Sequence, residues 1–469
     1  MTRNGTLMKS SSVPHAEMTD SHAVGGVSDS SVSDSVARYG ADSSAGSLAG
    51  LQVCVVACHF RPESSGSAPY NSLLVDTLAD AGAAVKVVTG VPHYPEWRVV
   101  DPQYQTGLRW RESPARPTGS GSVDIVRLRH AVPHNPGLLG RMRLELSFAA
   151  LSAPAVLATR ADIVIAVTPL LGAAVAGMVG RRRRPFGAIV HDQVGKAAVQ
   201  SGSTGGRVAN HIAAAEYSVL RRADRIGVVT EGFRPALVAG GVDDRRIVEV
   251  PLFSHVTPTN LAPAAARRAL GWRDTGRLTV VHTGNMGMKQ GLDHALEAAR
   301  VAAVRYPGEF EFVFVGDGNT RQALEHQARG LDGVRFVDPV SEAIYPLTLA
   351  AADVLLVHER PGVREMSLPS KLTSYTIASR PILAAVAENG ITGSLLSSRD
   401  AALLVPNGDP EALVSGLCEI RSDDALRVRL TDNARRLGEA EFSERLGRQH
   451  FVTFAKALTD FSERRKGQE

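Results

Sequence analysis

Cysteine and lysine are both scarce in this sequence. Its three cysteines, Cys54, Cys58 and Cys418, exclude a disulfide framework and a four-cysteine zinc site. Only seven of the 52 basic residues are lysines, so a lysine within a motif is more informative than usual. The 48 acidic residues leave a net charge of +4, a balance that is too even for a dedicated nucleic-acid binder.

Long apolar runs are also missing. The first fifty residues are rich in Ser, Gly, Asp and Ala, and they lack the apolar centre of a signal peptide. We therefore predict a cytoplasmic protein with a disordered tail over residues 1–49. The best candidate for a membrane span, residues 161–180, contains Asp162 and Pro169. Its apolar period changes at Pro169, so we expect a buried strand followed by a helix of small residues.

Several catalytic signatures do not occur. There is no Asp-x-Asp triplet, no Gly-x-Ser-x-Gly elbow, no Walker loop and no Gly-x-Gly-x-x-Gly run. The histidines do not cluster at metal-ligand spacing in the sequence. We therefore expect no metal site, and no serine-hydrolase or P-loop chemistry.

From Leu51 onward, short β-branched runs alternate with segments of helix length. Continuous apolar runs indicate strands that are buried on both faces, and their alternation with helices predicts a doubly wound α/β fold. The eleven runs begin at Leu51, Val85, Asp162, Ala188, Arg225, Leu278, Phe310, Val334, Asp353, Pro381 and Ala402.

Eleven strands are too many for one compact sheet, and residues 251–263 form a Pro- and Thr-rich break. We therefore predict an N-terminal domain over 50–255 and a C-terminal domain over 260–435. The final segment, 436–469, has an amphipathic helix that could cross back to the N-terminal domain.

Two strand-to-helix junctions in the second domain contain a lysine. The run GNMGMKQGLD places Gly284, Asn285 and Lys289 directly after a strand, where small residues and one ammonium group suit a phosphate. In LPSKLTSY, Ser370 is expected to cap a helix and Lys371 to lie in its first turn. A lysine there opposes the helix dipole unless an anion binds beside it. The alternative at both places is a solvated lysine.

Three further sites are less specific. Gly66 lies in a Ser-rich turn after the first strand, and Gly316, Asp317 and Gly318 end another strand, where glycine lets a ligand approach the backbone. His191 and Asp192 end a strand in the first domain. They could bind hydroxyl groups or transfer protons, although a structural histidine explains the pattern nearly as well.

Together these motifs resemble the family 4-type GT-B glycosyltransferases, in particular the exopolysaccharide enzymes of the colanic-acid type. The resemblance rests on HFRPESSGSAPYN from His59, HTGNMGMKQGLD, VGDGN and LPSKLTSYTIASRPILA, in this order over residues 51–435. It implies two Rossmann-like domains with the active site between them. It also implies a nucleotide-sugar donor bound mainly by the second domain, retention of configuration, and no metal or other cofactor.

The resemblance assigns roles residue by residue. Gly66 would lie near the donor phosphates, and His191 would contact the transferred sugar. The phosphate loop would contain Gly284, Asn285 and Lys289, the nucleoside would lie beside Gly316, Asp317 and Gly318, and the pyrophosphate would face Ser370 and Lys371.

The sequence departs from the family at two places. The family often has an arginine where Asn285 stands. It also has a pair of glutamates where this chain has Met366 and Ser374, with Glu365 one residue away. Ser374, at the position of the second glutamate, is still expected to belong to the donor-binding residues.

The hypothesis that fits best is a retaining glycosyltransferase of exopolysaccharide or cell-envelope assembly, with a glycan acceptor on a polyprenyl diphosphate at the cytoplasmic face of the membrane. Residues 133–160 mix arginine with Leu, Phe and Ala, as in a helix that lies on a membrane surface or in a core helix with snorkelling arginines. A sugar-nucleotide epimerase of the same fold, with Glu365 as its carboxylate, and a non-catalytic sugar-nucleotide-binding protein stay open.

Overall fold

The computed structural model describes most of the chain from Ser47 onward. The described residues are 47–63, 66–94, 96–118, 120–134, 137–193, 206–254, 256–363 and 368–466. Most of the predicted tail lies outside them. Leu48, which we had assigned to the tail, is buried, and its N–H donates to the carbonyl of Ala81 at 2.9 Å. The boundary at residue 49 is therefore wrong, because Leu48 already belongs to the folded domain.

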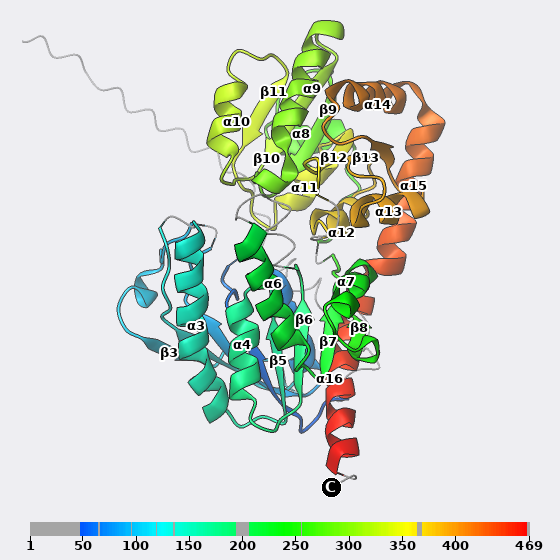
Figure 1. The fold of residues 1–469 in the computed structure, drawn as a ribbon. Helices are drawn as coiled ribbons and strands as arrows, with labels where there is room; N and C mark the ends of the chain where they lie inside the picture. The colour runs from blue at the N-terminus through cyan, green and yellow to red at the C-terminus, as the bar shows by residue number, and fades with distance from the viewer. Residues whose placement is uncertain are drawn as a thin grey trace, which may run out of the picture. The chain divides into compact units, whose positions relative to one another are not determined.

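The N-terminal lobe, residues 47–254, is built on an eight-stranded sheet with the order β3-β4-β2-β1-β5-β6-β7-β8 (Figure 1). All neighbouring strands are parallel except β3 and β4. The strands are β1 (Gln52–Val56), β2 (Ala84–Gly90), β3 (Arg109–Glu112), β4 (Val123–Leu128), β5 (Ile163–Val167), β6 (Phe186–Val190), β7 (Arg225–Val228) and β8 (Ile247–Glu249). The helices are α2 (Ala68–Asp80), α3 (Leu138–Ala158), α4 (Leu171–Gly180), α6 (Gly206–Leu220) and α7 (Arg234–Ala239).

The C-terminal lobe has a six-stranded, all-parallel sheet with the order β11-β10-β9-β12-β13-β14. Its strands are β9 (Leu278–Thr283), β10 (Phe310–Val315), β11 (Val334–Val337), β12 (Val354–His358), β13 (Ile382–Ala385) and β14 (Leu403–Val405). Its helices are α8 (Pro263–Ala269), α9 (Leu292–Arg305), α10 (Arg321–Gln327), α11 (Tyr345–Ala350), α12 (Lys371–Tyr375), α13 (Ile391–Ser398), α14 (Pro410–Ser422) and α15 (Asp424–Glu441). Strand order reverses between β9 and β12, and such switch points bind ligands in open α/β sheets.

The doubly wound fold is confirmed, and each of the eleven apolar runs contains a strand. Three strands, β3, β4 and β8, were not predicted. Charged residues hide the first two in the sequence: Arg127 of β4 is buried, and its Nε donates to Oε1 of Glu112 on β3 at 2.6 Å. These charged residues interrupt the apolar pattern of each strand. They are compatible with burial because they pair with each other once the strands are side by side.

The candidate membrane span folds as two elements of the N-terminal lobe. Residues 163–167 form β5, and residues 171–180 form α4, whose small residues pack against α3. Gly172 of α4 is held so close to α3 that a Cβ atom there would lie 2.5 Å from the carbonyl oxygen of Glu145. Among the described helices, none has the length and apolar character that crossing a bilayer requires.

The last helix, α16 (Glu444–Lys466), packs on the N-terminal sheet. Phe454 of α16 lies over Gly187 of β6 and Gly227 of β7, where a Cβ atom would come within 2.8 Å and 3.3 Å of its ring. Glycine at these two positions lets the helix approach the strands. The predicted boundary at residue 435 differs from the structure, because it falls inside α15.

Candidate functional site

The turn after β9 is fastened to the end of β12. A short 3₁₀ turn, η5 (Met288–Gln290), carries Lys289. The N–H of Arg360 donates to the Lys289 carbonyl at 2.8 Å, and Nδ1 of His358 donates to the Gln290 carbonyl at 2.7 Å. Gly291, with φ 56°, follows. A Cβ atom there would lie 2.9 Å from Cα of Arg360, so glycine permits this close approach and fixes Lys289 beside β12.

Lys371 starts α12 and is held by a buried histidine. Its Nζ lies 3.0 Å from Nε2 of His282 on β9, whose Nδ1 donates to the carbonyl of Leu356 at 3.2 Å. Burial and the charge of Lys371 keep the pKa of His282 well below its usual value, so the imidazole is neutral and accepts from the ammonium group. Burial lowers the pKa of Lys371 to about 7, and the nearby carboxylate of Glu359 partly offsets this effect.

Lys289 and Lys371 line the same cavity, although 82 residues separate them. The cavity lies beyond the carboxyl ends of β9 and β12, at the switch point of the sheet, and the space of about 360 Å³ within it is partly open to solvent. Its walls are Lys289, Gln290, Val357, His358, Glu359, Val363, Pro369 and Lys371. Two ammonium groups on one cavity wall suit an anion with several oxygens, such as a diphosphate.

Sequence reasoning missed Glu359, the acidic residue of the cavity. Glu359 follows β12 directly and is buried, and its Oε1 accepts a hydrogen bond from Oγ1 of Thr392 at 2.7 Å. Burial raises the pKa of this carboxyl to about 7, against the opposing effects of Thr392, Lys371 and Lys289. We considered Glu365 instead. Glu365 lies outside the described residues. A glutamate directly after a buried strand was the signal that could have revealed Glu359.

Ser370 takes the expected position before α12 without capping it, and Ser374 packs within the lobe. Ser370 stands at the start of α12, but its side chain forms no capping hydrogen bond. Ser374 is buried in a network of hydroxyl groups: its Oγ donates to the carbonyl of Lys371 at 3.0 Å and lies 3.1 Å from the hydroxyl oxygen of Tyr345. Ser374 therefore supports α12 and is not part of the cavity wall.

The glycines after β9 and β10 pack against each other. A Cβ atom on Gly316 would lie 2.1 Å from the carbonyl oxygen of Gly284, and one on Gly318 would lie 2.6 Å from Oδ1 of Asn285. Gly284 itself has φ 100°. Contact between the two loops thus explains the small residues at Gly316 and Gly318. The side chains of Asn285 and Asp317 are exposed.

In the N-terminal lobe, Gly66 lies just before α2, and His191 and Asp192 lie directly after β6. Gly66 has φ 65°, which favours glycine, and a Cβ atom there would contact Tyr94 at 3.3 Å. His191 follows β6, and burial lowers its pKa to about 4, so its ring is neutral. Burial raises the pKa of its neighbour Asp192, and the charge of Lys289 opposes this shift.

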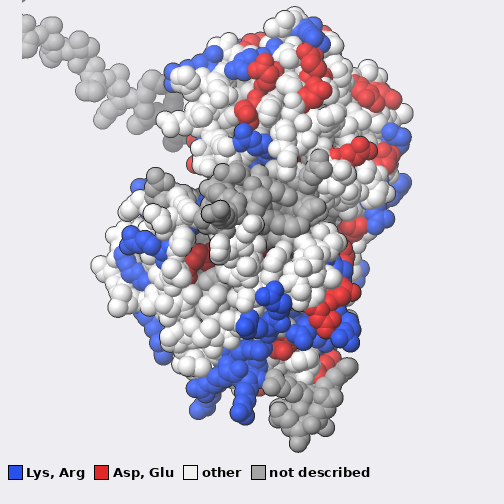
Figure 2. All heavy atoms as spheres, viewed as in Figure 1, with Lys and Arg blue, Asp and Glu red and all other residues white. Residues whose placement is uncertain are grey.

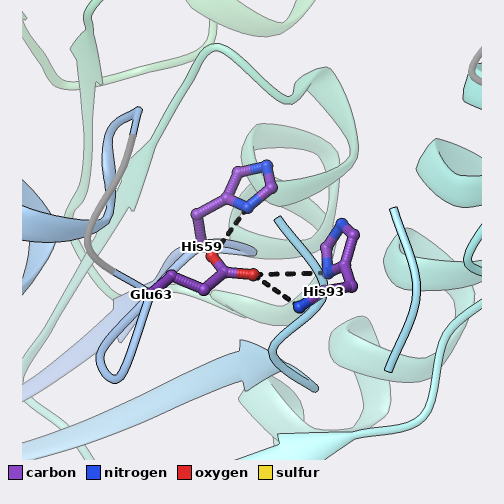
Figure 3. Close-up of side chains that lie close together, drawn as sticks. All are labelled: His59, Glu63 and His93. Atoms are coloured by element: carbon purple, nitrogen blue, oxygen red, sulfur yellow. Dashed lines mark hydrogen bonds and ion pairs between the residues drawn. The ribbon is translucent and has the colours of Figure 1, made fainter. Parts of the chain in front are cut away.

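A second cluster, His59, Glu63 and His93, was not predicted (Figure 3). Three histidines, His59, His93 and His130, follow β1, β2 and β4, which are neighbours in the sheet. Their rings form a row, with centroids 5.1 Å and 4.7 Å apart. The sequence signal was a histidine shortly after each of three strands. It could not be used, because the order of the strands was unknown and β4 had not been predicted.

Hydrogen bonds engage both carboxylate oxygens of Glu63 and one ring nitrogen each of His59 and His93, whereas Nε2 of His93 is buried without a hydrogen-bond partner among the described residues. Oε1 of Glu63 accepts from the N–H groups of His93 and Tyr94 at 2.7 Å and 2.9 Å, and its Oε2 lies 2.9 Å from Nδ1 of His59. Nδ1 of His93 lies 2.9 Å from the carbonyl of Val91. The three side chains offer ligand atoms within 4.8 Å of one another, and a metal ion bound there would compete with the hydrogen bonds that Glu63 makes. The arrangement is that of a clamp between the loops after β1 and β2.

Two family models match the chain: "Glycosyl transferase 4-like domain" over residues 65–253 and "Glycosyl transferases group 1" over residues 277–423. A protein of Escherichia coli K12 named as a colanic acid biosynthesis glycosyl transferase, WcaI, is 28% identical over 386 residues, which cover 78% of this chain and 91% of WcaI.

Solved structures show the same fold. Sucrose-phosphate synthase from Thermosynechococcus elongatus has a TM-score of 0.67 at 17% identity, covering 87% of this chain and 99% of that one. Anabaena HepE, in a complex with UDP-glucose, has a TM-score of 0.60 at 16% identity, covering 87% of this chain and 100% of that one. The matches support a transferase over an epimerase or a non-catalytic binding protein. With both lobes matched, the chain belongs to the GT-B glycosyltransferases of the 4-like and group 1 type.

Proposed function

We propose that this glycosyltransferase moves a sugar from a nucleotide-sugar to a lipid-linked glycan, with retention of configuration and without a metal ion, in exopolysaccharide or cell-envelope assembly at the cytoplasmic face of the membrane. The observation that carries the proposal is the placement of Lys289 and Lys371 on one cavity wall at the switch point of the C-terminal sheet. The similarity to WcaI supports the glycan class, and the HepE complex supports a nucleotide-sugar donor.

The proposed chemistry asks little of the protein beyond electrostatics. When the glycosidic bond to the donor breaks, negative charge develops on the leaving diphosphate, and two fixed ammonium groups stabilise it more strongly than water does. In a front-face displacement the leaving phosphate takes the proton of the acceptor hydroxyl. His191, which is neutral, would contact the transferred sugar by hydrogen bonding and would not need to act as a base.

A two-stage experiment tests this proposal. A thermal-shift screen with UDP-, GDP- and ADP-sugars identifies the donor, because a ligand that binds the native state raises its unfolding temperature. Transfer to a lipid-linked acceptor is then followed by NMR of the new glycosidic bond. An axial-to-axial or equatorial-to-equatorial outcome supports retention. Inversion, or hydrolysis or epimerisation of the donor without transfer, contradicts the proposal.

The membrane part of the proposal rests on α3. Large apolar side chains are exposed along one stripe of this helix: Leu139, Met142 and Leu146 are 76%, 45% and 66% exposed. Arg141 and Arg143 lie between them and are also exposed. In Figure 2 the surface over α3 is mostly white, with basic patches beside it. Apolar side chains flanked by arginines suit the interface of an anionic bilayer.

Vesicle co-sedimentation tests this contact. The wild-type protein should bind vesicles containing phosphatidylglycerol and bind phosphatidylcholine vesicles far less, and the double variant Leu139→Ser/Leu146→Ser should lose most of the binding. Val304 of α9 is 82% exposed, so Val304→Ser is a matched control that should bind as the wild type does. Equal binding by the double variant would exclude α3 as the contact.

A further inference from the structure

The cavity between β9 and β12 contains one acidic group among its basic ones, and each charged side chain has its own support. His282 holds Lys371, the end of β12 fixes the Lys289 turn, and Thr392 of α13 holds Glu359. All three charged residues line the cavity. Such individual support indicates that the position of the carboxylate matters as much as the positions of the ammonium groups.

The carboxylate of Glu359 is not suited to bind the phosphate groups of a ligand. An ionised carboxylate only accepts hydrogen bonds, and it repels a phosphate group that binds beside it. Its Oε1 accepts a hydrogen bond from Thr392, and Glu359 lines the cavity close enough to both lysines for their charges to act on its carboxyl group. A ligand that satisfies all three groups therefore carries an anionic part for the lysines and a hydroxyl donor next to it for Glu359.

We propose that Glu359 is a specificity-determining residue that accepts a hydrogen bond from a hydroxyl group of the nucleotide-sugar while Lys289 and Lys371 bind its diphosphate. The inference rests on the proposed donor site and adds to it the means by which the cavity distinguishes a sugar nucleotide from a bare polyphosphate. The hydroxyl group belongs either to the ribose or to the transferred sugar, and both present the same chemistry to a carboxylate.

Another role for Glu359 would be to neutralise the buried lysines only. In that case its removal would disturb every anion that the lysines bind, whether or not the anion carries a hydroxyl group. In the proposed role, removal disturbs only ligands with a hydroxyl group, because the support of Lys371 by His282 and of Lys289 by β12 persists without Glu359. Binding measurements with anions that carry a hydroxyl group and with anions that lack one therefore distinguish the two roles.

The test measures the dissociation constants of inorganic pyrophosphate, of UDP, GDP and ADP, and of UDP-glucose and GDP-mannose for the full chain. Glu359→Gln keeps the size of the side chain and removes its charge. Hydrogen bonds to charged groups are worth about 1.5–3 kcal/mol, which corresponds to about ten- to a hundredfold in affinity. We expect a loss of that size for the ligand that bears the recognised hydroxyl, and no loss for pyrophosphate, because the variant also removes the repulsion between the carboxylate and a phosphate group.

The pattern across the probes locates the hydroxyl group. A loss that already occurs with the nucleoside diphosphates assigns it to the ribose, whereas a loss that appears only with the sugar conjugates assigns it to the transferred sugar. Thr392→Val, which leaves the charge but frees the carboxylate, should give the same pattern with a smaller loss. Glu388→Gln, at an exposed glutamate outside the cavity wall, is the matched control and should change nothing.

Two results overturn the inference. One is an equal loss for pyrophosphate and for the sugar nucleotides in Glu359→Gln, which would make Glu359 a partner of the lysines only. The other is unchanged binding of every probe. If the wild-type protein binds none of the probes, the donor site proposed above fails as a whole, and Glu359 fails with it.

Discussion

The two lobes present charged groups at equivalent edges of their sheets, but they use them differently. In the C-terminal lobe Lys289, Lys371 and Glu359 line a cavity that is open to solvent. In the N-terminal lobe Glu63 is nearly surrounded by protein donors, two of them backbone N–H groups. A charged group that lines a cavity is still available to interact with a ligand. A charged group whose hydrogen bonds are all made within the protein contributes instead to the stability of the fold.

The comparison predicts that the largest effects on anion binding come from the two lysines. Lys289→Ala and Lys371→Ala should each weaken the binding of the nucleotide-sugar found in the thermal-shift screen by about ten- to a hundredfold. Because both groups bind one diphosphate, the losses in the double variant should be non-additive. Isothermal titration measures all three constants.

Lys456→Ala is a suitable control for the lysine variants, because Lys456 is exposed on α16, which packs on the N-terminal sheet. Unchanged donor binding in both single variants would remove the donor site from this cavity. A loss confined to one variant would show that only that ammonium group reaches the diphosphate.

The N-terminal clamp should respond in the opposite way. Glu63→Ala leaves two buried N–H groups, those of His93 and Tyr94, without an acceptor. An unsatisfied buried donor costs about 1–3 kcal/mol, so we expect the free energy of unfolding in urea to fall by about 2–4 kcal/mol. The affinity for pyrophosphate should change less than about threefold.

Glu96→Ala serves as the control for the clamp, because Glu96 is exposed in the same loop region. It should leave both stability and affinity unchanged. If Glu63→Ala weakened pyrophosphate binding as much as Lys371→Ala does, it would be wrong to assign anion binding to the C-terminal lobe and a stabilising role to Glu63.

The fold was largely predictable from the sequence, and the exceptions have a common cause. Strands buried on both faces need continuous apolar runs, so β1 and β9 could be recognised locally. In contrast, β4 carries Asp124 and Arg127, and its buried arginine is acceptable only because Glu112 of β3 pairs with it. A strand whose polar residues are satisfied by its neighbour cannot be recognised from its own composition.

The candidate site divides in the same way. Lys289 and Lys371 could be identified because each follows a strand, and the carboxyl ends of parallel strands lie at one edge. Glu359 also follows a strand directly and was overlooked, but its hydrogen bond with Thr392, 33 residues later in the chain, could not be predicted from the sequence. The row of histidines was missed because it requires β4 beside β2, and β4 was not predicted.

The pH dependence of donor binding should separate the lobes further. Lys371 and Glu359 both have pKa values of about 7, the former lowered and the latter raised by burial. As pH rises from 6 to 8.5, Lys371 loses its positive charge, which weakens diphosphate binding, whereas Glu359 becomes ionised and accepts the proposed hydroxyl hydrogen bond more strongly. The diphosphate of UDP-glucose does not titrate in this range. Loss of the Lys371 charge should outweigh the gain at Glu359, so the affinity should fall by roughly three- to tenfold, below the limit of tenfold per pH unit for one linked proton.

Lys371→Met is the informative variant for the pH profile. It removes the group that loses its charge, so the remaining fall should be much shallower than in the wild-type protein. An affinity that does not change between pH 6 and 8.5, or a fall of unchanged steepness in Lys371→Met, would show that another group controls the pH dependence.

The smallest effect is expected from metal chelation. Transfer should continue in excess EDTA, because the lysines provide the positive charge that a metal ion would otherwise supply. The measurement also tests the clamp: if the His59, Glu63 and His93 cluster bound a metal ion that the reaction needs, EDTA would abolish transfer and Zn²⁺ or Mn²⁺ would restore it. In that case His93→Ala should remove the metal from the purified protein, as measured by mass spectrometry, and the clamp would have to be reinterpreted as a metal site.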